Sequence, residues 1–245
     1  MTIEITEVIR RSIQGTTRPF LCSASDGQNY YVKGWGAGKE SLIFEWMAGS
    51  LAVAVGLPVP QFEVAVVPPE IVDSDLDEEL SDLGSGPVFA SLAVQQPIEI
   101  TESYKASVPT ELRQMVLVFD WWVRNEDRTL QNDIRNPNLL IASGSGALVV
   151  FDHNCAFDAT FNEEAFFENH VFAEDAKTIF SDMMTRAHYQ SLFAAALSRW
   201  PVFLDSLPEP WLYADKEMSV PLAVDLDGIF SELEERLQDR YWVMP

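Results

Sequence analysis

Residues 110–124 constrain the fold more than any other stretch, because they combine helical spacing with apolar residues on nearly every face. Met115, Val116, Phe119 and Trp122 are among these apolar residues. A helix that is apolar all round is buried on all sides and lies at the centre of its domain. The sequence therefore predicts a central helix, with the rest of a helical domain packed around it.

A polar loop follows this helix and leads to an apolar strand, with an acid at each end. Asp127 comes directly after the helix and Asp152 after the apolar run 147–151, with several asparagines between them. A phosphoryl-transfer site needs one carboxylate to orient the attacking hydroxyl and further oxygen ligands to hold Mg²⁺ on the nucleotide phosphates. These residue types fit such a site. They equally fit a solvated loop that joins a core helix to a core strand.

Lys33 ends the second strand of a predicted hairpin. Residues 20–23 and 29–33 are strand-like, and Asp26-Gly27 between them is typical of a tight hairpin turn. A charge on a half-buried strand faces either a partner or water. Lys33 is therefore either an edge lysine with its ammonium group in solvent or a lysine that contacts nucleotide phosphates from a strand.

A predicted helix over residues 39–55 follows this hairpin and ends at Gly56. Glu45 shares a face of this helix with alanine and glycine residues, by the i, i+3, i+4 rule. A carboxylate on such a face can approach a neighbouring sheet closely, as a partner of Lys33 would have to. Glu40 is the alternative partner, but its place in the first turn is explained by the helix dipole.

The stretch Gly15, Thr16, Thr17 and Arg18 separates the first predicted strand from the hairpin. Backbone N–H groups and hydroxyls of small residues can bind phosphate oxygens. An ordinary turn has the same composition.

The charge balance restricts the partners of the chain. It has 38 Asp and Glu residues against 16 Lys and Arg residues, a net charge of -22. This charge would repel a nucleic-acid backbone, so we expect no nucleic-acid binding, although a small basic pocket for nucleotide phosphates is compatible with it. Two cysteines are too few for a disulfide framework, and no apolar run is long enough to span a membrane. We therefore expect a cytoplasmic protein that does not bind membranes. The oligomeric state has no signal in the sequence.

Four segments, in this order, resemble the HipA-like kinases, a bacterial group related in fold to protein and lipid kinases. They are YYVKG, FEWMAGSLAVAVGLPVP, NEDRTLQN with RNPNLLI, and VVFDHNCAFD. The resemblance implies an α+β, two-lobed, protein-kinase-like fold. Residues 1–97 would form the N-terminal nucleotide-binding lobe, an antiparallel sheet with one helix, in which the acidic segment 70–86 is a surface insertion. Residues 98–245 would form a mostly helical catalytic lobe.

The resemblance also implies a role for individual residues. Lys33 would contact the α- and β-phosphates of ATP, and Glu45 would fix Lys33. Asp127 would orient the acceptor hydroxyl, and Asp152 would bind Mg²⁺. Residues 15–18 resemble the phosphate-binding loop of the family, with two threonines in place of serines.

The sequence departs from the family pattern at two points. The spacing from Asp127 points to Asn132 as the metal-binding asparagine, whereas continuity with the following strand points to Asn136; Asn138 is a further alternative. We favour Asn136 and keep Asn132 as its rival. Secondly, Asn154 stands where the family tends to have glycine, so we expect Asn154 to take over any glycine-like backbone geometry.

The expected function is the ATP- and Mg²⁺-dependent transfer of a γ-phosphoryl group to a Ser or Thr hydroxyl of a protein, with autophosphorylation as one form of it. Two alternatives stay open. In the first, the chain is a nucleotide-binding pseudokinase or a toxin-antitoxin-type interaction module. In the second, it is a kinase that phosphorylates a small molecule. The sequence does not name the phosphate acceptor.

Overall fold

Helices and strands both form, so the fold class is α+β, as predicted. The structure, a computed structural model, describes residues 2–13, 17–73, 78–130 and 136–244. The backbone divides into two units, and each is described below by itself. The first unit comprises Met1–Trp46, Pro60–Gln95 and Ser206–Val224, and the second comprises Met47–Val59, Gln96–Asp205 and Asp225–Pro245. The domain bounds 1–97 and 98–245 stay a prediction.

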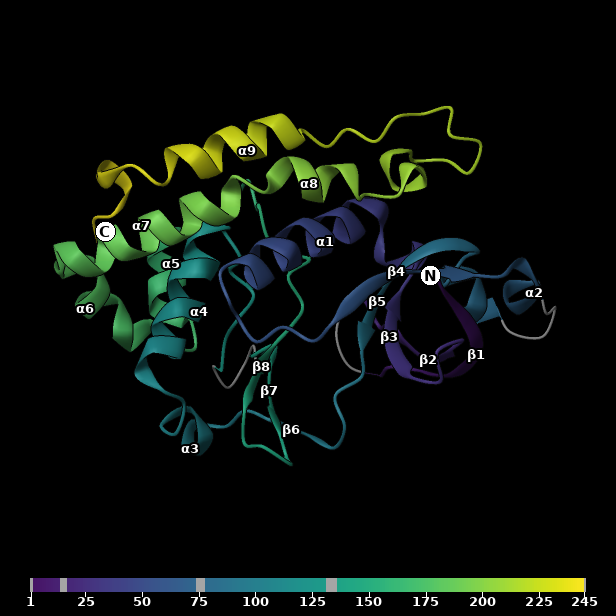
Figure 1. The fold of residues 1–245 in the computed structure, drawn as a ribbon, viewed down its shortest axis with the longest axis horizontal. Helices are drawn as coiled ribbons and strands as arrows, with labels where there is room; N and C mark the ends of the chain where they lie inside the picture. The colour runs from purple at the N-terminus through teal and green to yellow at the C-terminus, as the bar shows by residue number, and fades with distance from the viewer. Residues whose placement is uncertain (1, 14–16, 74–77, 131–135, 245) are drawn as a thin grey trace. The chain divides into compact units, whose positions relative to one another are not determined.

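Five strands form the first unit as a closed barrel in the order β1-β2-β3-β5-β4 (Figure 1). They are β1 (Ile3–Arg11), β2 (Phe20–Ala24), β3 (Asn29–Lys33), β4 (Phe62–Val67) and β5 (Gly86–Leu92). All neighbouring pairs are antiparallel except β1 and β4, which are parallel. The prediction of a wholly antiparallel sheet is wrong at this pair. The β1–β4 pairing joins the two edges of the sheet, which would otherwise present unpaired backbone groups.

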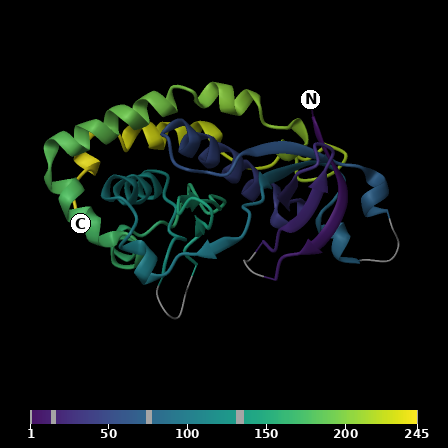
Figure 2. The same cartoon turned by 60° about the horizontal axis from the view of Figure 1, so that its bottom comes forward.

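The curvature of the barrel comes largely from β1, whose pairing with β2 shifts register twice. Such bulges bend a strand and increase its twist. Figure 2 shows the purple strands curving around the barrel from a second direction. Buried residues of the strands, together with Leu83, form an apolar core: Ile5, Phe20, Cys22, Ala24, Tyr30, Val32, Ala65, Val67, Leu83, Val88 and Ala90. Burial raises the pKa of the Cys22 thiol to about 12, so this cysteine is a neutral core residue.

The predicted hairpin between β2 and β3 forms at the Asp26-Gly27 turn. Asp26 Oδ1 accepts a hydrogen bond from the backbone N–H of Gln28 at 2.9 Å, and Gly27 has a φ of 81°. A side chain at this φ would be strained, which explains the glycine. The helix that follows, α1 (Lys39–Ala54), ends at Gly56, whose φ is 88°. Both elements therefore agree with the sequence prediction.

The acidic segment 70–86 is more than a surface insertion. It contains the end of α2 (Pro69–Val72), residues 74–77, which lie outside the described residues, and the 3-10 helix η2 (Glu78–Asp82). Leu83 is fully buried in the barrel core, and Asp82 pairs with Arg11 at 2.6 Å. The segment therefore contributes to the core of the first unit.

Residues 206–224 return to the first unit, which the sequence did not predict. They carry the 3-10 helix η4 (Glu209–Leu212), and the indole of Trp211 donates a hydrogen bond to the carbonyl of Pro87, at the start of β5, at 2.9 Å. A further 3-10 helix, η1 (Trp35–Ala37), lies between β3 and α1.

The second unit is mostly helical, with α4 at its centre, as the sequence predicted. Helix α4 is Thr110–Trp122, and all its residues from Val116 to Trp122 are buried. The other helices are α3 (Glu102–Lys105), α5 (Glu163–Asn169), α6 (Ala176–Ser181), α7 (Met183–Leu197), α8 (Trp200–Asp205) and α9 (Leu226–Glu235), with the 3-10 helices η3 (Ala173–Asp175) and η5 (Asp239–Tyr241). Helices α7 and α9 lie side by side (Figure 1).

A small antiparallel sheet in this unit has the order β6-β7-β8. A hairpin consists of β7 (Leu139–Ala142) and β8 (Leu148–Val150), and β6 (Pro97–Glu99) adds an unpredicted edge strand. Helices α6 and α7 are separated at Asp182. Its carboxylate caps α7 by accepting a hydrogen bond from the N–H of Thr185 at 2.8 Å.

Within the described ranges, no helix is both long enough and apolar enough to cross a bilayer.

Candidate functional site

Lys33 and Glu45 form a buried ion pair in the first unit. Lys33 is the last residue of β3, and its Nζ lies 2.6 Å from Oε2 of Glu45 on α1. Both side chains are buried, whereas Glu40, the alternative partner, is exposed in the first turn of α1. The expected pairing of Lys33 with Glu45 is present. The role of Lys33 in nucleotide binding stays a prediction.

The loop that should bind phosphate is only partly described. Gly15 and Thr16 lie outside the described residues. Arg18 is described and adopts a positive φ of 41°. Its guanidinium group lies 3.4 Å from a carboxylate oxygen of Glu79, and both side chains are largely exposed. The phosphate contacts of Thr17 and Arg18 therefore stay a prediction.

Asp127 is held by two asparagines in the second unit. Asn136 Nδ2 donates to Asp127 Oδ1 at 2.7 Å, and Asn138 Nδ2 donates to Asp127 Oδ2 at 3.0 Å. Asn136 reaches this position because its backbone exchanges two hydrogen bonds of 3.0 Å with Thr129, which brings it back beside the start of the loop. Both carboxylate oxygens of Asp127 are thus oriented.

Asp127 has a pKa above its ordinary value. Burial is the main cause, and the negative charge of Asp152 also raises the pKa of Asp127. The hydrogen bonds from Asn136 and Asn138 and the charge of Arg128 oppose this increase. A raised pKa makes a carboxylate a stronger base, which suits a group that accepts the proton of a hydroxyl.

The negative charges of Asp127 and Asp152 repel each other, and a divalent cation bound beside them would relieve this repulsion. Mg²⁺ prefers oxygen ligands, and Asp152 and Asn136 supply a carboxylate and an amide oxygen. Asn132, the rival of Asn136, lies outside the described residues. Among the described residues there is no group of three His, Cys, Asp or Glu side chains that could enclose a metal by themselves. Metal binding by Asp152 and Asn136 therefore stays a prediction.

The backbone around these residues is locally strained. Asn138 and Asp152 adopt positive φ values of 47° and 60°. Asn154, which we expected to take over the glycine-like geometry, is not among the residues with positive φ, so this prediction is wrong. Asp152 itself adopts the left-handed conformation. Residues held in such conformations are concentrated at functional sites, where the surrounding structure enforces them.

A buried polar network supports the Asp127 loop, and the sequence interpretation missed it. Arg128, the residue after Asp127, donates through Nε to Oδ2 of Asp120 at 2.7 Å. Its Nη1 donates to the carbonyl oxygens of Asn138 at 2.6 Å and Phe151 at 3.2 Å. Arg128 therefore connects α4 to the backbone at Asn138 and to the residue before Asp152.

Asp120 collects two further hydrogen bonds. It accepts from Asn125 Nδ2 at 2.9 Å, and His170 Nε2 lies 3.1 Å from its Oδ2. The N–H of Phe172 donates to His170 Nδ1 at 3.1 Å, so the Nε2 nitrogen carries the proton and donates to Asp120. Burial alone would raise the pKa of Asp120, but the charge of Arg128 and the contact with His170 outweigh it and hold this pKa well below its usual range. Burial lowers the pKa of His170, which is therefore neutral at pH 7.

One signal in the sequence could have revealed this network. Asp120 is an acid within a helix that is apolar on nearly every face, and a buried carboxylate requires a partner. Arg128, eight residues after Asp120, is the next basic residue along the chain after Arg124.

The comparison with models of protein families confirms the resemblance. The sequence model of the HipA-like kinase family matches residues 5–245. Among solved structures, the crystal structure of a Helicobacter pylori proinflammatory kinase, CtkA, is similar with a TM-score of 0.49 and 12% identity, over 98% of this chain and 94% of that chain. At this distance the likeness transfers no residue role. No curated protein matches the chain.

Proposed function

Because the chain belongs to the family of HipA-like kinases, we propose that it transfers the γ-phosphoryl group of ATP, with Mg²⁺, to a Ser or Thr hydroxyl of a protein. The observation that carries this proposal is the state of Asp127, a half-buried carboxylate that Asn136 and Asn138 orient and whose pKa is raised. We further infer that the two units correspond to the two lobes of a protein-kinase-like fold.

In the proposed reaction, Asp127 orients the acceptor hydroxyl and takes up its proton. The hydroxyl oxygen attacks the γ-phosphorus, a new P–O bond forms, and the bond to the β–γ bridging oxygen breaks to release ADP. Lys33, oriented by Glu45, holds the α- and β-phosphates, with the loop of residues 15–18 as a further phosphate contact. The network of Arg128 keeps the Asp127 loop in place. Bound Mg²⁺, held by Asp152 and Asn136, would neutralise charge on the transferred group.

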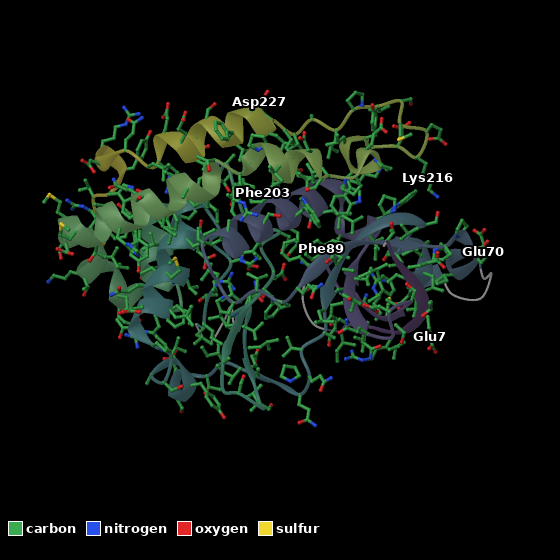
Figure 3. The ribbon with its side chains drawn as sticks, viewed as in Figure 1. Glu7, Glu70, Phe89, Phe203, Lys216 and Asp227 are labelled. Atoms are coloured by element: carbon green, nitrogen blue, oxygen red, sulfur yellow. The ribbon has the colours of Figure 1, made fainter. Side chains whose placement is uncertain are left out.

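The test is transfer of label from γ-labelled ATP with Mg²⁺, to the chain itself and to proteins of a cell extract. Asp127→Asn should lower the rate at least about 100-fold, because the variant retains the shape but loses the base. Asp227→Asn is the matched control, since Asp227 is an exposed acid on α9 (Figure 3), and it should retain the wild-type rate.

The destination of the label separates the proposal from its alternatives. Acid-stable label in a protein band supports a Ser or Thr acceptor, whereas label confined to small molecules supports a metabolite kinase. A rise in melting temperature with ATP and Mg²⁺, without any label transfer, would instead identify a nucleotide-binding pseudokinase.

A further inference from the structure

A pocket of about 270 Å³ lies in the first unit and shares no residue with the groups to which a kinase role is assigned above. Its walls combine aromatic, proline and methionine side chains with two lysines. The residues that carry the argument are Trp35, Lys39, Pro87, Trp211, Asp215 and Lys216.

The two aromatic walls of this pocket are fixed in position. The ring of Trp35 packs against Gly84 so closely that a Cβ atom there would lie 2.5 Å from it. Gly84 also has a positive φ of 68°, so a side chain is disfavoured on both grounds. Trp211 is buried and bonded to the carbonyl of Pro87. Both rings are therefore held in place by their neighbours, as is usual for the walls of ligand pockets.

Two ammonium groups lie against the same ring. Lys216 Nζ is 4.2 Å and Lys39 Nζ is 5.5 Å from the centre of the Trp35 ring. Figure 3 labels Lys216 on the connection that follows η4. Lys39 Nζ also makes a long contact of 3.4 Å with the carbonyl oxygen of Asp215. Neither ammonium group forms an ion pair with a carboxylate of the described residues.

Asp215 is the acidic residue among those that line the pocket, and its carboxylate is engaged elsewhere. It accepts hydrogen bonds from the hydroxyl of Ser219 at 2.6 Å and from the N–H of Val220 at 2.8 Å. These bonds lower the pKa of Asp215 to about 2 and hold together the turn that carries Lys216. Two lysines against one engaged carboxylate leave the pocket positively charged, in a chain whose net charge is -22.

We propose that this pocket binds a phosphate or carboxylate group attached to a flat apolar ring. The ring packs between the walls of Trp35 and Trp211, and the anion lies between Lys39 and Lys216. Lys39 is the first residue of α1, so the helix dipole also favours an anion there. The small volume restricts the ligand to one ring with its anionic group, supplied by a free small molecule or by one side chain of a peptide. This inference does not depend on the proposed kinase function.

The test uses the full chain and calorimetric titration with phenyl phosphate, in the absence of Mg²⁺ and with saturating adenosine to occupy a nucleoside site. Inorganic phosphate, which lacks the ring, should bind more weakly, and benzylamine, which reverses the charge, should not bind. Lys216→Met and Lys39→Met should each weaken phenyl phosphate at least about tenfold, the effect of losing one charge-assisted hydrogen bond. Lys177→Met removes an exposed lysine of α6 in the second unit and should leave the affinity unchanged.

Unaltered melting temperatures would show that the variants fold, as expected for the exposed Lys216. Equal affinities of wild type and the double variant Lys39→Met/Lys216→Met, or no binding of phenyl phosphate by wild type, would overturn the proposal. A titration with a short phosphotyrosine peptide distinguishes the two sources of the ligand, a side chain of a peptide and a free small molecule. Tighter binding than phenyl phosphate identifies a protein segment as the ligand, and weaker binding identifies a free small molecule.

Discussion

The two units bury charge in different ways. In the first unit, Lys33 and Glu45 meet side chain to side chain, and their side chains are 8% and 5% exposed. In the second unit, Arg128 and Asp120 are 0% and 1% exposed, and Arg128 also donates to backbone carbonyls of two other segments. A lysine in a side-chain pair can turn toward a ligand by bond rotation alone. An arginine bonded to three segments cannot, so we infer that Arg128 fixes the backbone while Lys33 stays able to act.

The largest effect should follow the loss of Arg128. Arg128→Met leaves the Asp120 carboxylate buried without its main counter-charge, which lowers the free energy of unfolding by about 3–5 kcal/mol. Urea denaturation measures this change. Arg240→Met is the control, because Arg240 pairs with Glu235 on the surface, with 61% and 56% of the side chains exposed, and should change stability by less than about 1 kcal/mol. Equal losses in the two variants would contradict a fixing role for Arg128.

The loss of Lys33 should lower stability less than the loss of Arg128 does. A second substitution should restore most of the lost stability. Lys33→Met leaves the carboxylate of Glu45 without this partner and costs about 1–3 kcal/mol. The double variant Lys33→Met/Glu45→Leu removes both charges and should recover most of that loss, because an apolar pair of similar volume replaces a buried ion pair well. Its affinity for ATP, measured by calorimetry, should stay low. Recovered ATP binding in the double variant would argue against a phosphate contact by Lys33.

The smallest effect concerns the pH dependence of stability. Because burial lowers the pKa of His170 below 6.5, the unfolded chain binds a proton that the folded chain does not as the pH falls through 6.5. Stability is therefore complete above this pH and decreases below it. His170→Gln keeps a donor toward Asp120 but does not titrate, so its melting temperature should fall less between pH 7.5 and pH 5.5 than that of the wild type.

The variants must be compared by the decrease in melting temperature between pH 7.5 and pH 5.5, and not by the melting temperature at a single pH. Glutamine cannot reproduce the bond that His170 accepts from the N–H of Phe172, and this loss is the same at every pH. His188→Gln, at an exposed position of α7, should retain the wild-type pH dependence. An identical pH dependence in all three proteins would exclude a neutral His170 as its source.

Local patterns were sufficient for much of the fold and for part of the candidate site. The Asp-Gly turn, the glycine after α1 and the all-round apolar helix α4 depend on neighbouring residues, so the sequence predicted them. The same kind of pattern predicted the face of α1 that presents Glu45. Asn138, in contrast, contacts Asp127 through a loop conformation with positive φ that spacing alone does not reveal.

The sequence by itself determined where most of the helices and strands form, which residues bear the candidate chemistry and which family the chain belongs to. Only the tertiary structure decided the partners of the buried Asp120 and the closure of the barrel. Asp120 meets His170 across 50 residues of sequence, β1 meets β4 in parallel, and Trp211 reaches Pro87 from the far end of the chain. These contacts depend on the distances between folded segments, and local spacing along the chain does not encode them.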